Sequence, residues 1–457
     1  MKRKIDLTLD TWLSKRKQAI LLYGARQSGK TYAIRECFKR NRAPYVEINF
    51  ATDKTALSLF ARLADANDFY TKLSLCCNGS LEMGRTCVFL DEIQEVYSYR
   101  EELKKTRPEE VRLTIDPIAL MKELVEDGRF RYAISGSLLG IKLSQISSVP
   151  IGYLDKHILY PLDFEEFLWA KGIGDEAIDY LRLKYLALEE IDETIHNKFL
   201  RLFRQYILVG GMPEAVKEYV ASADLNLVSL IHRSIVEGYR DDIQKYAPKE
   251  NRLLIGETYD SLASELNRKD KHFRKSKLDY PNSKNIDMEN AFLWLTEAGV
   301  AIPCRNVACP CYPLTINEQR KTLKLFYNDI GLLCSSLLDK EGAIKILDGD
   351  SSINFGAPHE NVIAQELFAH SGASSHYLNS KKYGEIDFLT QKNGEVVPLE
   401  IKSGEPNRNG FFAHKALDNA LKAYPSIKRA FVLSKRNIAK ENEKIANIPF
   451  YCVMFCA

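Results

Sequence analysis

The sequence contains no apolar run of the roughly 18 residues that a membrane-spanning helix requires, so a membrane partner is not expected. Cysteine is sparse, at 10 of 457 residues, which excludes a disulfide framework and predicts free thiols. Neither sign of charge dominates, because 64 Lys and Arg residues face 61 Asp and Glu residues and leave a formal net charge of +3. Any contact with nucleic acid therefore needs a local basic patch rather than a basic field over the whole chain. These absences together predict a cytoplasmic protein.

The composition does contain enough apolar material for several folded cores. Of the residues, 45% are hydrophobic and 27% are charged, as in ordinary soluble proteins, and a length of 457 residues fits two or three domains. Three cysteines gather in one segment, at Cys304, Cys309 and Cys311. A structural zinc site needs a fourth ligand at paired spacing, so zinc is not expected here.

The first domain, residues 1–165, alternates short apolar runs with amphipathic segments, which predicts an α/β fold with a parallel sheet covered by helices. Helices are expected over residues 32–40 and 118–126. The charged insert at residues 97–117 is expected to be a solvated excursion. The expected strands cover residues 19–23, 45–49, 87–90, 131–135 and 157–160.

The rest of the chain divides into a helical middle, residues 166–340, and an α/β region, residues 341–457. Helical spacing in the middle breaks at Gly210-Gly211-Met212-Pro213. Two further helices and short extended runs follow, an order that is typical of a winged helix. In the last region we expect a helix, a hairpin with Asn393-Gly394 at its turn, and then a second helix with strands.

A phosphate-binding motif, G-x-x-x-x-G-K-[ST], lies between the first expected strand and the helix that follows it. Its glycines let backbone N–H groups turn around phosphate oxygens, and the start of the helix adds positive potential. Lys30 is expected to reach the β and γ phosphates of ATP, and the Thr31 hydroxyl to bind Mg²⁺. The residues expected to bind ATP in this motif are Gly24, Ala25, Arg26, Gln27, Ser28, Gly29, Lys30 and Thr31.

Two acids follow the strand expected at residues 87–90. Paired carboxylates at a buried strand tip are costly unless a cation lies beside them. Asp91 is therefore expected to hold Mg²⁺ through water, and Glu92 to polarise the water that attacks the γ phosphate. Ser135 ends the fourth expected strand and offers a hydroxyl near that phosphate. Lys30, Asp91 and Glu92 are the predicted catalytic residues of an ATPase.

Together these motifs resemble a family of prokaryotic AAA+ ATPases that carry a C-terminal domain of unknown function. The resemblance implies a P-loop core with an additional strand, a helical and winged-helix middle, and a C-terminal α/β domain similar to PD-(D/E)xK nucleases. Besides the phosphate loop, the acidic strand end and the turn at Ser135, it rests on residues 160–167, 210–214, 384–388 and 399–404.

The chain departs from this family at one place. Many members have Gly-Arg where this sequence reads Gly152-Tyr153, so an arginine that could touch the phosphate is missing. Such an arginine is worth about 10³ to 10⁵ in turnover. Arg26, Arg129 or Arg131 could take its place, or hydrolysis could be slow until a partner completes the site.

A second group of acids lies in the last region. Glu400 and Lys402 alternate along one expected strand and share a face, while Asp387 ends the strand before the hairpin turn. Glu360 lies on the apolar face of a helix, where an unpaired carboxylate is costly. Such a group can bind a second Mg²⁺ or Mn²⁺, and the corresponding acids of PD-(D/E)xK nucleases cut DNA with magnesium. DNA cutting, nucleic-acid binding without cutting, and a salt-bridged structural cluster all stay open.

Residues 268–277 concentrate positive charge around one aromatic side chain, which fits either contact with DNA phosphates or a solvated surface. Two functions follow from the sequence. The first is a magnesium-dependent ATPase whose nucleotide state controls a nuclease-like, DNA-binding C-terminal domain. The alternative is an ATP-gated scaffold or signalling protein with little turnover and an inactive nuclease-like domain. It would act on a partner protein or on copies of itself.

Overall fold

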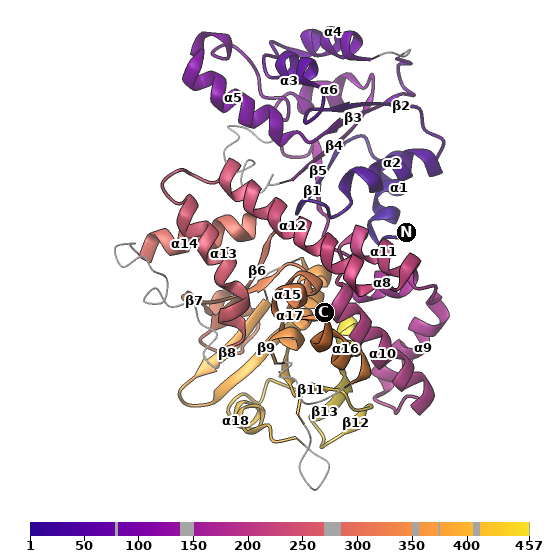
Figure 1. Cartoon of the computed structure of the whole chain (residues 1–457), viewed down its shortest axis with the longest axis vertical. Coiled ribbons are helices and arrows are strands. Elements are labelled where there is room, and N and C mark those ends of the chain that lie inside the picture. Colours follow the sequence, from indigo (N-terminus) through magenta and orange to yellow (C-terminus); the bar gives the residue numbers. More distant parts are fainter. Residues whose placement is uncertain are drawn as a thin grey trace. The chain divides into compact units, whose positions relative to one another are not determined.

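The computed structural model describes residues 1–77, 81–137, 150–268, 285–349, 356–372, 375–404 and 412–456 (Figure 1). The basic residues 269–277 that the sequence singles out lie outside the described residues. Two compact units make up the chain, and the break after residue 160 lies close to the predicted boundary at residue 165. One unit consists of Lys2–Tyr160 with Glu297–Gly299, and the other of Met1, Pro161–Thr296 and Val300–Ala457.

The first unit is built on a five-stranded parallel sheet with the order β2-β3-β4-β1-β5. Its strands are β1 Ala19–Gly24, β2 Tyr45–Asn49, β3 Cys87–Asp91, β4 Arg131–Ser137 and β5 Leu154–Ile158. All five predicted strands form, and only the last is displaced along the chain. Because β4 lies between β1 and β3, the additional strand that the resemblance implies is present. The prediction of a P-loop α/β fold is therefore confirmed.

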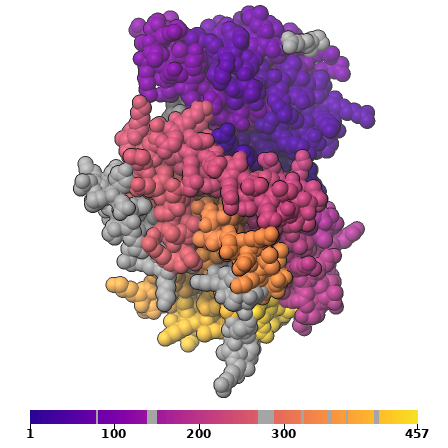
Figure 2. Space-filling model, viewed as in Figure 1, coloured from indigo at the N-terminus to yellow at the C-terminus, as the bar shows by residue number. Residues whose placement is uncertain are grey.

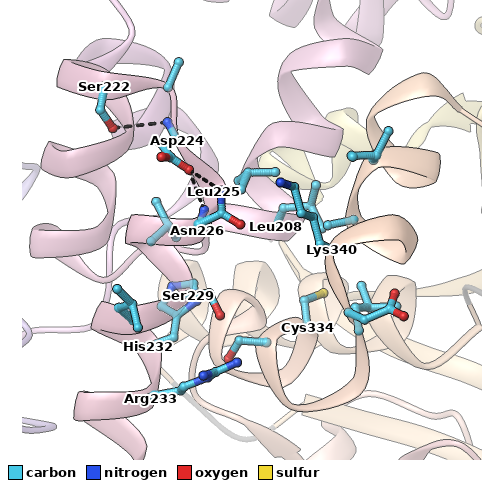
Figure 3. A pocket seen from close by; sticks show the side chains of 18 residues that line it. Leu208, Ser222, Asp224, Leu225, Asn226, Ser229, His232, Arg233, Cys334 and Lys340 are labelled. Atoms are coloured by element: carbon cyan, nitrogen blue, oxygen red, sulfur yellow. Dashed lines mark hydrogen bonds between the residues drawn. The ribbon is translucent and has the colours of Figure 1, made fainter.

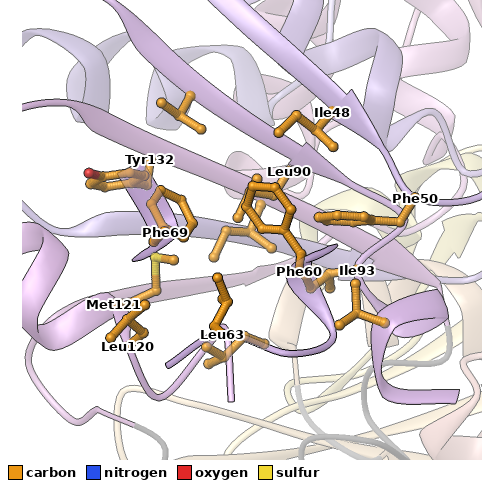
Figure 4. Packing of buried hydrophobic residues seen from close by; sticks show 14 of the residues in the cluster. Ile48, Phe50, Phe60, Leu63, Phe69, Leu90, Ile93, Leu120, Met121 and Tyr132 are labelled. Carbon is orange, nitrogen blue, oxygen red and sulfur yellow. The ribbon is translucent and has the colours of Figure 1, made fainter. Parts of the chain in front are cut away.

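Helices cover both faces of this sheet because alternate residues of its central strands point to opposite sides, and both sides are apolar. In β1, Leu21 belongs to one core and Leu22 to the other. The larger core includes Phe60 and Phe69, whose rings meet edge to face at a centroid distance of 5.3 Å (Figure 4). The smaller core lies under α1 Ile5–Lys15 and α2 Lys30–Arg40, and the larger under α3 Lys54–Phe60, α4 Ala66–Cys76, α5 Gln94–Thr106 and α6 Met121–Asp127.

The prediction that the charged insert at residues 97–117 is a solvated excursion is wrong. Much of it belongs to α5, which buries the side chains of Tyr97, Arg100 and Leu103 along one face. The guanidinium of Arg100 donates to the carbonyl oxygen of Ala61 at 2.6 Å, so a backbone partner replaces water. The inward positions follow the helical period, and the many charged residues between them concealed that pattern in the sequence.

The second unit begins with a run of helices, as the prediction of a helical middle requires. These helices are α8 Phe164–Ala170, α9 Asp175–Ala187, α10 Glu193–Val209, α11 Pro213–Ser222, α12 Leu225–Tyr246, α13 Arg252–Leu266 and α14 Asn285–Glu297, followed after two strands by α15 Ile330–Leu337 and α16 Lys340–Asp348. The break between α10 and α11 falls at the predicted glycine pair.

Gly210 and Gly211 make room for a buried carboxylate, that of Asp329. A Cβ on Gly210, whose φ is 67°, would collide with this carboxylate, and a Cβ on Gly211 would collide with the backbone of Leu162. The Gly211 N–H donates to Asp329 at 2.6 Å, and the Leu332 N–H donates to it at 3.2 Å. Burial raises the pKa of Asp329 to about 6, although these N–H groups lower it.

An eight-stranded sheet with the order β12-β13-β11-β10-β9-β8-β6-β7 forms the centre of the second unit. Its strands are β6 Ala301–Val307, β7 Glu318–Tyr327, β8 Ser375–Ser380, β9 Gly384–Lys392, β10 Glu395–Ile401, β11 Ala430–Ser434, β12 Ala439–Lys440 and β13 Ile445–Pro449. The hairpin of β6 and β7 follows α13 and α14, in the order that suggests a winged helix, and β6 runs parallel to β8. Strands from both sides of the predicted boundary at residue 340 thus share one sheet.

The last region has the order helix, three antiparallel strands, helix, strand. α17, Gly356–Ser371, precedes β8, β9 and β10, and α18, Lys415–Ala423, precedes β11, which runs parallel to β10. The hairpin predicted at Asn393-Gly394 is confirmed, and these residues have φ values of 51° and 81°, as a tight two-residue turn requires. The described chain ends in a buried 3-10 segment, Phe450–Phe455.

None of the helices in the described residues is both long and apolar enough to cross a membrane. A disulfide joins Cys309 to Cys311, so the prediction of free thiols throughout is wrong for this pair. The other eight cysteines are free.

Candidate functional site

The phosphate-binding motif forms the loop between β1 and the first turn of α2. Gly24, Gln27 and Gly29 have positive φ values of 145°, 64° and 94°. A Cβ on Gly24 would collide with the carbonyl oxygen of Leu159, so only glycine fits there. The Ser28 hydroxyl is buried and has no hydrogen-bond partner among the residues that the structure describes. An unsatisfied buried hydroxyl in this loop is consistent with a ligand that supplies the partner.

Lys30 is the first residue of α2, and its side chain is buried. Its ammonium group donates to the carbonyl oxygen of Ala25 at 2.7 Å and to that of Gly24 at 3.3 Å. A buried cation at the start of a helix adds to the positive potential that the helix already has there. The arrangement is therefore favourable where an anion such as phosphate can bind.

Arg3 supports the same loop from outside the motif. Its buried guanidinium donates to the carbonyl oxygen of Ser28 at 3.2 Å and to that of Tyr160 at 2.8 Å. The loop is thus tied to the last residue of the first unit. Sequence reasoning missed Arg3 because it belongs to no motif and lies 25 residues from Ser28 in the chain.

Asp91, at the end of β3, is the centre of a group of hydrogen bonds. The Thr31 hydroxyl donates to its carboxylate at 3.0 Å, and the Asn49 side-chain amide donates at 2.8 Å. The Ser135 hydroxyl is a third donor to the same carboxylate. Asn49 and Asp91 face each other in the register of β2 and β3. The structure therefore brings together the predicted residues Thr31, Asp91 and Ser135, and it adds Asn49, whose place at the end of a predicted strand was an available signal.

Glu92 follows Asp91 with a positive φ of 56°, a conformation that is strained for a residue with a side chain. The Gln94 amide nitrogen donates to the Glu92 carboxylate, and its amide oxygen accepts from the Ser137 N–H at 3.1 Å. The Ile93 N–H donates to the Ser135 carbonyl oxygen at 3.0 Å. These contacts fix the carboxylate of Glu92 at the same end of the sheet as Asp91.

Two of the three arginines proposed to replace the missing one lie elsewhere. Arg131 starts β4, about 13 Å along the strand from Ser135, and donates to the carbonyl oxygen of Arg16 at 3.1 Å. Arg129 is paired with Asp127 at 2.8 Å. Both therefore lie at the amino end of the sheet, whereas the phosphate loop lies at the carboxyl end. Arg26 remains, as an exposed residue of the loop itself.

The contacts around the loop fit a complex of a nucleotide with Mg²⁺. Mg²⁺ takes oxygen ligands and is commonly bound by one or two protein side chains together with phosphates and water. The Thr31 hydroxyl and the Asp91 carboxylate offer oxygen atoms of this kind, and they lie next to each other. The glycine-lined loop, the unsatisfied Ser28 hydroxyl and the buried Lys30 ammonium would form the part that binds an anion.

The second group of acids lies in the eight-stranded sheet. We call Glu360, Glu385, Asp387 and Glu400 the C-terminal acidic cluster. Asp387, on β9, accepts from the Ile401 N–H of β10 at 2.8 Å. Burial, together with the charges of Glu360 and Glu400, raises the pKa of Asp387 to about 7, against a lowering by Lys324 and by the Ile401 N–H.

Glu400 and Lys402 lie on the same face of the chain, as predicted, and form an ion pair of 2.6 Å. Burial raises the pKa of Glu400, and the hydrogen bond from Lys402 lowers it in part. The second carboxylate oxygen of Glu400 is buried and has no hydrogen-bond partner among the described residues. The carboxylate is therefore satisfied on one side only.

Lys324 joins the cluster from β7, and no motif in the sequence indicated it. Its side chain is buried, pairs with Glu385, and lies 4.5 Å from the centre of the Tyr377 ring. Burial lowers the pKa of Lys324, but the carboxylates of Glu360, Glu385 and Asp387 outweigh that effect and raise it. Within the described residues, no three His, Cys, Asp or Glu side chains are grouped so that they could hold a metal ion.

Helix α17, which carries Glu360, also anchors the segment that follows the first unit. Glu366 accepts from the Phe164 N–H at 2.9 Å and from the Tyr206 hydroxyl at 2.9 Å. The His370 imidazole lies 3.0 Å from the carboxylate of Asp163. One helix therefore carries Glu360 of the C-terminal acidic cluster and contacts the residues that follow the first unit.

A cavity of about 720 Å³ lies in the second unit between the start of α12 and helices α15 and α16 (Figure 3). Figure 2 shows the face of the second unit that carries two helices beside this cavity, α12 in pink and α16 in orange. Two polar side chains that line the cavity cap these helices, since Asp224 caps α12 and Asp339 caps α16. Burial lowers the pKa of His232, on its wall, to about 4, although a contact with the carbonyl oxygen of Val209 at 3.0 Å raises it.

Comparisons with known protein families assign three segments. Residues 16–168 match a family model described as an AAA domain. Residues 200–342 match a domain of unknown function, DUF8612, and residues 355–453 match another, DUF4143. No curated protein matches the chain.

Several solved structures are similar to this chain at low identity. They include the Walker-type ATPase PABY2304 of Pyrococcus abyssi, with 14% identity and a TM-score of 0.43 over 74% of this chain and 96% of that one. A STAND protein with a tetratricopeptide repeat sensor, PH0952 of Pyrococcus horikoshii, has 12% identity and a TM-score of 0.27 over 81% of this chain and 48% of that one. Cdc6p of Pyrobaculum aerophilum has 12% identity and a TM-score of 0.23 over 75% of this chain and 92% of that one. Because these TM-scores lie below 0.5, we infer function only from the AAA match and from the site.

Proposed function

We propose that this chain, whose residues 16–168 form an AAA domain of the P-loop ATPase type, hydrolyses ATP with Mg²⁺ and thereby controls a nuclease-like, DNA-binding C-terminal domain. The observation that carries the ATPase part is the hydrogen bond of 3.0 Å between Thr31 and Asp91. It joins the phosphate-binding motif to the acidic strand end across 60 residues of chain. A cytoplasmic location remains a prediction from the sequence.

In this proposal the backbone N–H groups of residues 24–31 and the ammonium of Lys30 bind the β and γ phosphates. Thr31 and Asp91 hold Mg²⁺, which supplies positive charge to the phosphate oxygens when it is bound. Glu92 orients the attacking water and accepts its proton, and Gln94 holds the Glu92 carboxylate in place.

The missing arginine bears on the rate of hydrolysis. Arg129 and Arg131 are held at the other end of the sheet, which leaves Arg26 as the candidate within the phosphate loop. An arginine from a partner protein, or from another copy of the chain, is the second source that we propose. In that case the isolated chain turns over slowly and accelerates when the partner binds.

The C-terminal part of the proposal rests on the order α17, β8, β9, β10, α18, β11 together with the positions of Asp387, Glu400 and Lys402. This order and these residues resemble PD-(D/E)xK nucleases, and DNA is the partner that the resemblance suggests. Coupling to the nucleotide would run through α17, which holds Phe164 by way of Glu366 and carries Glu360 on the same helix. Movement of the segment after the first unit would then reach the C-terminal acidic cluster.

The second Mg²⁺ or Mn²⁺ of such a nuclease does not fit the cluster as the structure arranges it. Three metal-ligating side chains do not come together there within the described residues, and Glu400 is paired with Lys402. This observation favours the alternative function, in which the C-terminal domain binds without cutting and the protein acts as an ATP-gated scaffold or signalling protein. Steady-state hydrolysis at ordinary AAA+ rates by the purified chain would argue against this alternative.

ATP binding is tested by titrating nucleotide against the Lys30→Ala variant. We expect a loss of affinity, because the variant removes the buried cation of the phosphate loop. Lys39→Ala is the matched control, since Lys39 lies on the same helix with its side chain 79% exposed. Equal ATP affinity in the parent and in Lys30→Ala would overturn the proposal.

DNA cutting is tested by incubating linear, branched and circular DNA with Mg²⁺ or Mn²⁺. Asp387→Ala and Lys402→Ala serve as the two inactivating variants. Cutting that both variants abolish would establish the nuclease, whereas cutting that survives both would come from another site or a contaminant. DNA binding without cutting supports the alternative function.

A further inference from the structure

We propose that the C-terminal acidic cluster is neutralised by a buried lysine of its own chain, Lys324, in the place where a nuclease of this type would bind a divalent cation. The proposal refines the C-terminal part of the proposed function. It does not depend on ATP binding, so the two can fail separately.

The position of Lys324 is the first argument. It lies on β7, opposite Cys304 of β6, and Cys304 in turn pairs with Ser375 of β8, so the lysine reaches the cluster across the extended sheet. Its side chain is 2% exposed, although a lysine is almost never fully buried without a partner. The partner is Glu385, and the ammonium also lies 4.5 Å from the centre of the Tyr377 ring.

The charge balance is the second argument. Glu360 and Glu400 are buried and Asp387 is half-buried, and buried carboxylates need a compensating cation, whereas Glu385 is 40% exposed and keeps contact with water. Lys324 interacts with the charges of Glu360 and Asp387 in addition to its contact with Glu385. Asp387 also accepts from the Ile401 N–H at 2.8 Å. The remaining member of the cluster, Glu400, has its own cation in Lys402, at 2.6 Å.

The absence of a ligand set is the third argument. A divalent cation needs several oxygen ligands at about 2.0–2.6 Å, all directed at one point. With the Lys324 ammonium among these carboxylates, no three metal-ligating side chains of the residues that the structure describes meet in this way. A metal ion would have to displace the Lys324 ammonium from the carboxylates whose charge this ammonium offsets in part.

Lys324 comes from a different region of the chain than the acids, which distinguishes this cluster from a nuclease site whose residues all belong to one domain. Lys324 belongs to the segment matched by DUF8612, residues 200–342, whereas the acids belong to the segment matched by DUF4143, residues 355–453. The charge balance of the C-terminal domain therefore depends on a strand from the preceding region.

The test measures the thermal unfolding midpoint of the full chain without nucleotide, in EDTA and in millimolar Mn²⁺. An Asp91→Asn background removes the metal ligand of the ATP site from all samples. We expect no effect of Mn²⁺ on the midpoint while Lys324 is present. Lys324→Met should have a lower midpoint in EDTA and regain at least about 3 °C when Mn²⁺ is added, because the cation then replaces the lost charge.

Two variants control for packing. Lys324→Arg keeps the charge and should show no response to Mn²⁺. Lys428→Met removes a lysine from an exposed ion pair with Glu395 in the same sheet and should behave like the parent. The double variant Lys324→Met/Asp387→Asn removes one acid with the lysine and should be more stable in EDTA than Lys324→Met alone.

The proposal would be overturned if Mn²⁺ raised the unfolding midpoint of the parent as much as that of Lys324→Met. It would also be overturned if Mn²⁺ did not raise the unfolding midpoint of Lys324→Met. Should Lys324→Met not fold, direct Mn²⁺ titration of the folded Asp91→Asn chain decides the question. Binding of Mn²⁺ that Asp387→Asn abolishes would overturn the proposal, and no binding would support it. Loss of ATP binding in Lys30→Ala is a separate result and leaves this inference unaffected.

Discussion

Replacing Asn49 by alanine tests whether the hydrogen bonds around Asp91 prepare that carboxylate for Mg²⁺. The Asn49 amide donates to Asp91 at 2.8 Å, and Asp91 is only 1% exposed, so water cannot easily take the place of the amide. A hydrogen bond to a charged group contributes about 1.5–3 kcal/mol to stability. Loss of such a partner behind a metal ligand typically costs about 10–100-fold in metal affinity. We therefore expect the Mg²⁺ concentration for half-maximal ATP hydrolysis to rise by about 10–100-fold.

The assay follows ATP hydrolysis over a range of Mg²⁺ concentrations, with ATP binding in EDTA measured alongside. Binding in EDTA should change little, because the variant leaves the phosphate loop and Lys30 intact. Asn41→Ala is a matched control, since Asn41 also donates its side-chain amide to an aspartate, Asp10, at 2.7 Å, but on an exposed surface. An unchanged Mg²⁺ midpoint in Asn49→Ala, or an equal shift in the control, would refute the reasoning.

Three further predictions concern single residues. Gly24→Ala should destabilise the chain by at least about 2 kcal/mol and abolish ATP binding, because the new Cβ would collide with the Leu159 carbonyl oxygen at a residue with positive φ. Thermal unfolding and nucleotide titration measure these two effects. Gly84→Ala is the control, because Gly84 also has a positive φ but has open space around the position of a Cβ. Glu92→Gln should lower the steady-state rate of hydrolysis by about 10²–10⁴ and leave ATP affinity unchanged, and a rate equal to that of the parent would contradict the assigned role. Because the folded chain raises the pKa of Asp329 from 3.8 to about 6, its stabilising contribution is complete below about pH 4 and is lost as the pH rises through 6. The parent should therefore lose about 3 kcal/mol of its free energy of unfolding between pH 4 and pH 7 that Asp329→Asn does not lose. Denaturant titrations of both proteins at the two pH values measure this, and a difference between the two proteins that does not change with pH would contradict this account.

The parts of the fold that local pattern determines were predictable. The strands of the first unit are short apolar runs bounded by polar residues, and the glycines of the phosphate loop have a fixed spacing. The turn at Asn393-Gly394 requires two positive φ values that these residue types accept readily. Each of these signals lies within a few residues of chain.

The parts that depend on pairing between distant strands were not predictable. Asn49 meets Asp91 because β2 lies beside β3 in a particular register, and Lys324 reaches Glu385 because β7 extends a sheet formed mostly by later residues. Arg3 contacts the phosphate loop only after α1 folds back along the sheet. In the insert at residues 97–117, abundant charge concealed a helical period that packing revealed.

The pairing of β6 with β8 matters for anyone who isolates the C-terminal domain. A fragment beginning at residue 341 would lack β6 and β7, so β8 would become an edge strand with unsatisfied backbone N–H and C=O groups. Its apolar side chains, among them the buried Tyr377 and Leu378, would lose part of their cover. Such a fragment is expected to aggregate, whereas one that begins with α13, at Arg252, keeps the hairpin that protects this edge.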